Sequence, residues 1–167
     1  MPRCAFLTLD DPTGYLIDDE LAYEPLHALG WTVEAVPWRS DVRWQDYDVV
    51  VIRSTWDYQH DPVGFLDALA RIERAGVPLH NPLDLVRWNL DKRYLRDLAG
   101  RGVPIVPTVW LDRLGPGALA EVFDKVGSDE IVVKPVVSAN AYATYRLQRQ
   151  TAHEVAESVE AHFAGRA

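Results

Sequence analysis

The chain has 167 residues, a length that suits one domain of ordinary size or two small lobes. Hydrophobic residues make up 48% of it, as in globular proteins, and the formal net charge of −8 argues against nucleic-acid binding through a broad basic face. Cys4 is the single cysteine, which excludes an internal disulfide, and no apolar run approaches the roughly 20 residues that a membrane span needs. Because no signal-peptide pattern follows Met1, we expect a cytoplasmic protein.

The first half of the chain alternates short apolar strands with helices. Strands are predicted at residues 4–9, 31–36, 48–52 and 77–79. A first helix is predicted from Asp18 or Asp19 to about Leu29, with apolar positions Leu21, Leu26 and Leu29. A second is predicted from Pro62 to about Ala75, with apolar positions Phe65, Leu66, Leu69 and Ile72. This alternation predicts a parallel sheet with right-handed crossovers, so we expect an α/β lobe over residues 1–88.

From residue 89 onward the pattern changes to a mixed α+β one. Helices are predicted at 91–98, 118–126 and 154–163, the first of them capped by Asn89 or Asp91. Residues 103–110 are apolar but interrupted by two prolines, which predicts an edge-type strand. We therefore place a second domain at residues 89–167.

The most informative stretch is EIVVKPVVSANAYATYRL, which spans residues 130–147. Residues 131–133 are β-branched and predict a buried strand, and a second strand returns after a loop of small and polar residues. Lys134 ends the first strand, where a lysine is costly to bury unless an anion meets it. Its ammonium, the loop N–H groups and the hydroxyls of Ser138 or Thr144 suit a phosphate. The alternative is an ordinary hairpin whose lysine reaches out to solvent.

Five segments, taken in order and with their spacing, give the chain a resemblance to the ATP-grasp superfamily. They are Arg53–Tyr58, Asn81-Pro82, Trp88–Leu95, Gly102–Thr108 and Val133-Lys134-Pro135. Within the superfamily the chain is most similar to the glutathione-synthetase-like and RimK-like ligases, a group that includes cycloserine-type cyclo-ligases. The series covers most of the chain.

The resemblance implies a parallel-sheet pre-ATP-grasp lobe at 1–88, followed by the small α+β first lobe of an ATP-grasp fold. It also implies an ADP-forming carboxylate–amine ligase that acts through an acyl-phosphate, uses ATP and Mg²⁺, and takes a small carboxylate or amino-acid-like substrate. Lys92 matches the family's first nucleotide lysine, and Lys134 matches the second. The family's phosphate-covering loop matches Ser138, Ala139, Asn140 and Thr144. Two ammonium groups on separate elements can neutralise a triphosphate from two sides.

Each assignment has an alternative. Lys92 lies in a run, Asp91-Lys92-Arg93, that is usually a solvated helix face. Arg53, Trp56 and Asp57 follow a strand at its carboxyl end, where open α/β sheets bind ligands, so they are candidates to bind the substrate's carboxylate or amine. The alternative is an Arg53–Asp57 ion pair with Trp56 packed at a lobe interface.

Asp10 and Asp11, after the first strand, are similar candidates, although the sequence DDPTG favours a plain turn. The family's magnesium ligands lie in a second ATP-grasp lobe, and nothing in residues 151–167 matches those motifs. We therefore assign no metal ligand and no catalytic residue. We expect the front portion of a ligase, without ATP turnover of its own. The alternative is a non-catalytic nucleotide-binding or interaction module, for which an apolar surface would favour a homodimer.

Overall fold

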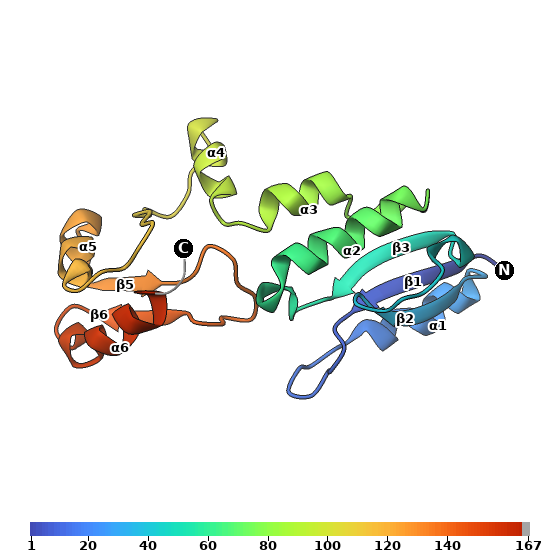
Figure 1. Cartoon of the computed structure of the whole chain (residues 1–167), viewed down its shortest axis with the longest axis horizontal. Helices are drawn as coiled ribbons and strands as arrows, with labels where there is room; N and C mark the ends of the chain where they lie inside the picture. Colours follow the sequence, from blue (N-terminus) through green and yellow to red (C-terminus); the bar gives the residue numbers. More distant parts are fainter. Residues whose placement is uncertain (165–167) are drawn as a thin grey trace. The chain divides into compact units, whose positions relative to one another are not determined.

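The computed structural model describes residues 1–164. The chain divides into two compact units, Met1–Asp91 and Lys92–Ala167 (Figure 1). Each unit has a hydrophobic core of its own. Within the described residues, no helix is both long enough and apolar enough to cross a membrane.

A four-stranded parallel sheet in the order β2-β1-β3-β4 is the framework of the first unit. Its strands are β1 Arg3–Thr8, β2 Thr32–Pro37, β3 Val49–Ser54 and β4 Leu79–His80. β1 lies between two partners, and its residues 4–8 are all buried, as expected of a strand with both faces covered. The α/β class and the parallel sheet predicted from the sequence are confirmed.

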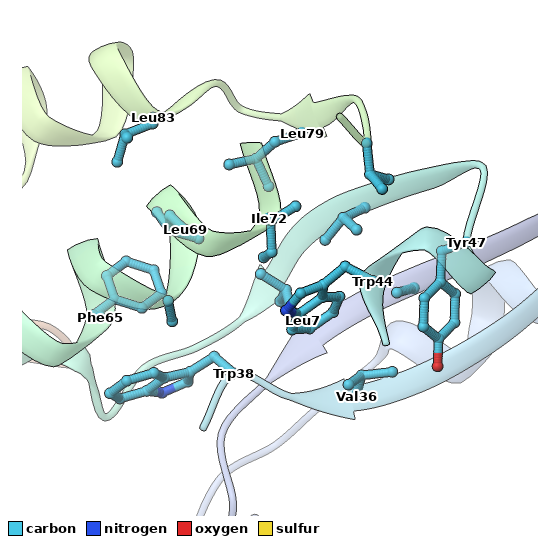
Figure 2. Packing of buried hydrophobic residues seen from close by; sticks show 14 residues of the cluster. Leu7, Val36, Trp38, Trp44, Tyr47, Phe65, Leu69, Ile72, Leu79 and Leu83 are labelled. Carbon is cyan, nitrogen blue, oxygen red and sulfur yellow. The ribbon is translucent and has the colours of Figure 1, made fainter. Parts of the chain in front are cut away.

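Helices cover both faces of this sheet. Successive residues of a strand point to opposite faces, and β1 follows that rule. Phe6 packs against Tyr23 of α1 (Tyr23–Ala28), with ring centroids 5.9 Å apart. Leu7 belongs instead to the core under α2 (Pro62–Arg74), as Figure 2 shows. The predicted apolar stripe of α2 is confirmed, because Phe65, Leu69 and Ile72 are buried and Leu66 packs against the same core.

Two tryptophans from the loop between β2 and β3 complete that core. Trp38 is 2% exposed and Trp44 is 5% exposed, and both lie beside the residues of α2 (Figure 2). Trp38 makes an edge-to-face contact with Phe65 at 5.3 Å. The loop is therefore anchored by large aromatic side chains, each of which buries a large apolar surface.

The predicted first helix is wrong in its continuity and in its apolar face. The structure has a 3₁₀ turn, η1 (Asp19–Ala22), followed by the short α1. Pro25 explains the break, because it has no N–H to bond a carbonyl of the turn before it and is tolerated only in the first turn of a new helix. Leu21 and Leu29 are 78% and 75% exposed rather than packed inward. The remaining helices of this unit are η2 Trp44–Asp46, η3 Tyr58–His60 and α3 Leu83–Asn89.

The second unit is built on an antiparallel hairpin that two helices cover. Its elements are α4 Tyr94–Gly100, α5 Ala118–Val126, β5 Glu130–Val133, β6 Tyr145–Gln148 and α6 Ala152–Ala164. Ile131 and Leu147 pair across the hairpin and pack with Phe123 of α5 and Val159 of α6. A two-stranded ribbon is marginal in water, so this helical cover is what makes the unit stable.

Two predictions for the second unit are wrong. Residues 103–110 form no strand in the structure, and Pro104 and Pro107, which lack an N–H, would each leave a gap in a ladder. The helix predicted at 91–98 begins only at Tyr94, without a side-chain cap, because Asn89 is the last residue of α3 instead of a cap for α4.

Candidate functional sites

In the second unit, the loop of the hairpin carries most of the predicted phosphate-binding residues. β5 ends at Val133, which pairs with Tyr145 of β6, and residues 134–144 make the connection. Lys134 is the first residue of this loop and its side chain is exposed. Its ammonium can therefore meet an anion that approaches the loop from solvent.

Lys92 is hydrogen-bonded to the same loop, although it lies 46 residues before Ser138 in the sequence. Its Nζ donates to the carbonyl oxygen and to Oγ of Ser138, each at 2.9 Å. Its backbone N–H donates to the carbonyl of Val136 at 2.8 Å. Lys92 is only partly exposed and precedes α4, so it does not lie on the face of that helix. The structure thus brings one predicted nucleotide lysine onto the loop that begins with the other.

The middle of the loop has an unusual backbone. Asn140, Ala141 and Ala143 have φ values of 48°, 55° and 51°, in the left-handed region that side chains with a Cβ seldom occupy. The N–H groups of Tyr142 and Thr144 close turns onto the carbonyls of Ala139 and Ala141, at 2.9 and 3.0 Å. Among the described residues, no carbonyl accepts from the N–H of Asn140, Ala141 or Ala143. Backbone N–H groups gathered in this way form concave sites that bind anions.

In the first unit, charged side chains gather at the carboxyl ends of three adjacent strands. Asp10 follows β1, Arg39 follows β2 and Asp57 follows β3. Arg39 Nη1 donates to Asp10 Oδ2 at 2.9 Å and also to Asp57 Oδ2, and the indole of Trp38 donates to Asp57 Oδ1 at 2.7 Å. Burial by itself lowers the pKa of Arg39, but the hydrogen bonds to Asp57 and Asp10 outweigh it and raise that pKa, so the guanidinium stays charged.

Arg53 is paired with Asp19, and the Arg53–Asp57 pair considered from the sequence is therefore wrong. Arg53 Nε donates to Asp19 Oδ1 at 2.9 Å, and Nη2 lies 2.8 Å from the same oxygen. The hydroxyl of Ser54 donates to Asp19 Oδ2 at 2.6 Å. Asp19 is buried and comes from η1, so this ion pair also connects η1 to the end of β3.

The remaining predicted residues at this edge have local roles. Trp56 is partly buried and contacts Tyr15, with ring centroids 5.8 Å apart. Asp11 accepts a hydrogen bond from the N–H of Thr13 at 2.9 Å, which is the plain turn favoured by the sequence. Hydrogen bonds from Thr13 also lower the pKa of Asp11. Asp10 differs from Asp11, because its carboxylate is engaged by Arg39.

Sequence reasoning missed Arg39 and the pairing role of Asp19. Arg39 lies two residues after the end of β2, and the rule that ligands bind at the carboxyl ends of parallel strands would have found it. Asp19 carried no such signal, because its sequence context is that of a helix cap. Among residues 1–164, no group of three or more His, Cys, Asp or Glu side chains is placed to hold a metal ion.

Comparison with solved structures identifies the fold first. Over 95% of its length, the chain superimposes on ATP-grasp proteins. One is a RimK-domain ATP-grasp protein from Sphaerobacter thermophilus, with TM-score 0.68 and 17% identity over 59% of that chain. Another is the ATP-grasp ligase PsnB in complex with its precursor peptide PsnA2 and AMPPNP, with TM-score 0.55 and 17% identity over 62% of that chain. At 17% identity these likenesses show the fold alone, and they confirm the fold expected from the resemblance, that of the front portion of ATP-grasp proteins.

Three further matches show which particular protein the chain is similar to. Residues 4–81 match the family of the N-terminal domain of D-cycloserine synthetase DcsG. The chain is 36% identical to the cycloserine biosynthesis protein DcsG of Streptomyces lavendulae over 141 residues, which is 81% of this chain and 46% of that protein. The crystal structure of D-cycloserine synthetase DcsG has TM-score 0.76 and 34% identity over 95% of this chain and 55% of that one. The chain therefore spans about half the length of the relatives that it matches.

Proposed function

We propose that this chain carries the ATP-binding portion of an ADP-forming carboxylate–amine ligase that acts through an acyl-phosphate. The observation that carries the proposal is the contact of Lys92 with the loop after Lys134, since Nζ of Lys92 lies 2.9 Å from Ser138. The family resemblance assigns both lysines to nucleotide phosphates. Their arrival at one loop from distant parts of the sequence supports that assignment.

The chemistry explains why such a loop would be useful. A carboxylate oxygen attacks the γ-phosphorus of ATP, ADP leaves, and an amine then displaces phosphate from the acyl-phosphate. Negative charge on the phosphates shifts during the first step and must be stabilised. Lys92 and Lys134 would supply positive charge, and the N–H groups of residues 140, 141 and 143 would bond phosphate oxygens. Magnesium would accompany the nucleotide, and we assign it no ligand within residues 1–164.

The substrate would bind at the strand ends of the first unit. We propose a small carboxylate or amino-acid-like substrate, with Arg53, Trp56 and Asp57 facing it. Asp57 already accepts from Arg39 and Trp38, so its role would be to orient these groups as much as to bind substrate directly. One similar protein, PsnB, is a ligase by name, and another, DcsG, is a synthetase by name, which favours this class of reaction over a purely structural role.

A thermal-shift experiment tests the nucleotide site. A non-hydrolysable ATP analogue with magnesium should raise the Tm of the chain, because a ligand that binds the native state stabilises it by mass action. Lys134→Ala should weaken analogue binding by about tenfold or more, the equivalent of one charge-assisted hydrogen bond. Lys125→Ala is the matched control, since Lys125 is an exposed lysine of α5 that pairs with Glu121 at 3.6 Å. Equal shifts for the two variants, or none for the native chain, would contradict the proposal.

A further inference from the structure

The carboxylate of Asp19 is almost fully removed from solvent. Its side chain is 5% exposed, and it belongs to a small group of buried polar residues in the described chain: Thr8, Asp19, Ser54, Thr55 and Ser138. A buried carboxylate is costly unless hydrogen-bond donors surround it. Asp19 meets that condition with Arg53 at Oδ1 and Ser54 at Oδ2. Both of its oxygens are thus used to hold neighbours at the end of β3.

The guanidinium of Arg53 is bonded to Asp19 along its Nε–Nη2 edge, whereas its Nη1–Nη2 edge is available to a ligand. Its Nε and Nη2 both approach Asp19 Oδ1, so the side edge of the fork is occupied. Its Nη1 has no acceptor within residues 1–164, and the side chain is 41% exposed. The guanidinium carbon also lies 5.5 Å from the ring centroid of Phe6, which restricts its movement further. The edge formed by Nη1 and Nη2 can therefore donate two parallel hydrogen bonds.

We propose that Asp19 is a positioning residue, which holds Arg53 so that its Nη1–Nη2 edge binds the carboxylate of a substrate. The proposal rests on the proposed function for the substrate site and names the chemical group that this site takes. A carboxylate fits because its two oxygens match the two parallel donors of a guanidinium. An amine does not fit, because Arg53 has no acceptor to offer it.

A purely electrostatic view predicts that Asp19 weakens carboxylate binding, whereas the positioning view predicts that it strengthens it. Asp19 neutralises the charge of Arg53, so on Coulomb attraction alone its removal should strengthen the binding of a carboxylate. On the positioning view its removal should weaken binding, because a mobile arginine loses more conformational entropy when it binds. Asp19→Asn removes the charge and keeps an acceptor for Arg53, whereas Asp19→Ala removes both. The two variants therefore separate charge from geometry.

The test is a titration of the native chain and its variants, in which the Nε–H signal of Arg53 in NMR spectra reports binding. The probes are N-acetylglycine, which has a carboxylate and no amine, and glycinamide, which has an amine and no carboxylate. We expect a saturable shift with N-acetylglycine alone. Asp19→Ala should raise its Kd by about tenfold, the equivalent of one charge-assisted hydrogen bond, and Asp19→Asn should change it much less. Asp84→Ala is the control, since Asp84 is 94% exposed and pairs with Arg87.

The outcomes decide the proposal without reference to ATP. A saturable shift with glycinamide, no shift with N-acetylglycine, or tighter binding in both Asp19 variants would overturn it. Where Asp19→Ala does not fold, Ser54→Ala replaces it, because it removes one of the two groups that hold Asp19 and should weaken binding to a smaller extent. Arg53→Lys lacks the Nε–H group, so its titration is followed by the backbone N–H signals of Ser54 and Thr55, which should no longer shift, since an ammonium offers no parallel pair of donors. Failure of nucleotide binding would leave these results intact, so the two proposals are tested separately.

Discussion

At the scale of single residues, Tyr47 and Tyr58 of the first unit have environments that disfavour their charged form. Tyr47 is 7% exposed and donates to Glu34 Oε2 at 2.9 Å, and Tyr58 stacks on Phe65 at 5.5 Å. Burial raises the pKa of both phenols, and the hydrogen bond to Glu34 raises that of Tyr47 further. Their neutral forms are therefore favoured in the folded protein.

These shifts predict a loss of stability at alkaline pH. A tyrosine in the unfolded chain ionises at a pKa of about 10, below the raised pKa in the fold. The stabilisation is complete below about pH 10 and is lost as pH rises through the folded pKa, because the unfolded state then releases protons first. Urea unfolding between about pH 8 and pH 11 should show this loss. The double variant Tyr47→Phe, Tyr58→Phe should lose less stability over this range, and an unchanged slope would refute the explanation.

The position of a residue was predictable from the sequence where a local pattern fixed it. Lys134 could be placed at a strand end because apolar, β-branched residues precede it. The partner of Arg53 could not be found in this way, because Asp19 lies 34 residues earlier in an irregular turn. Only the folded arrangement of η1 beside β3 brings the two together. Ion pairs of this kind depend on tertiary proximity, which single-sequence patterns do not contain.

At the scale of elements, α2 illustrates how a helix start is fixed. Asp61 is its N-cap, and Oδ1 accepts from the N–H of Gly64 at 2.9 Å, while Pro62 stands at the first position. Both features were readable from the sequence, and the predicted start of the helix is correct. The cap leaves no room beside it, because a Cβ at Gly64 would collide with the carboxylate of Asp61.

This geometry predicts opposite results for two glycine substitutions. Replacing an exposed helical glycine by alanine commonly stabilises a protein by about 0.4–1 kcal/mol. Gly100→Ala, at the end of α4, should do so, because nothing lies within 4 Å of the new Cβ. Gly64→Ala should destabilise instead, by about 1 kcal/mol, since it displaces the cap, and Asp61→Ala should cost a similar amount. Chemical denaturation measures all three, and stabilisation by Gly64→Ala would contradict the role of the cap.

Elements were predictable where periodicity and local signals agreed. Residues 118–126 form a helix with the predicted bounds, because a strong apolar stripe lies between two glycines with positive φ, Gly117 and Gly127. The segment at 103–110 shows the opposite case, because an apolar pattern alone does not make a strand without a partner to pair with. The break between η1 and α1 was also not predicted, since the leucine spacing indicated one continuous helix although Pro25 cannot lie in the interior of a helix.

At the scale of the whole molecule, the chain consists of two compact units, and each unit carries some of the residues of the proposed binding sites. Lys92, Lys134 and the loop at 138–144 belong to the second unit, whereas Arg53 and Asp19 belong to the first. Each group of residues is held by contacts within its own unit: Lys92 by Ser138, and Arg53 by Asp19. Each unit therefore contains the contacts that organise its own proposed site.

This division predicts which residues nucleotide binding will protect from hydrogen exchange. At a free concentration about 100 times Kd, a ligand stabilises the state that it binds by about 2.7 kcal/mol, and hydrogen exchange reports where that stabilisation suppresses local opening. With a non-hydrolysable ATP analogue we expect slower exchange in residues 134–148 and little change in β1 and β3. With the tenfold higher Kd expected for Lys134→Ala, the stabilisation at the same analogue concentration should fall to about 1.4 kcal/mol, so exchange in this segment should slow less. Slower exchange in β1 and β3 alone would place the nucleotide in the first unit, and the roles proposed for Lys92 and Lys134 would then be wrong.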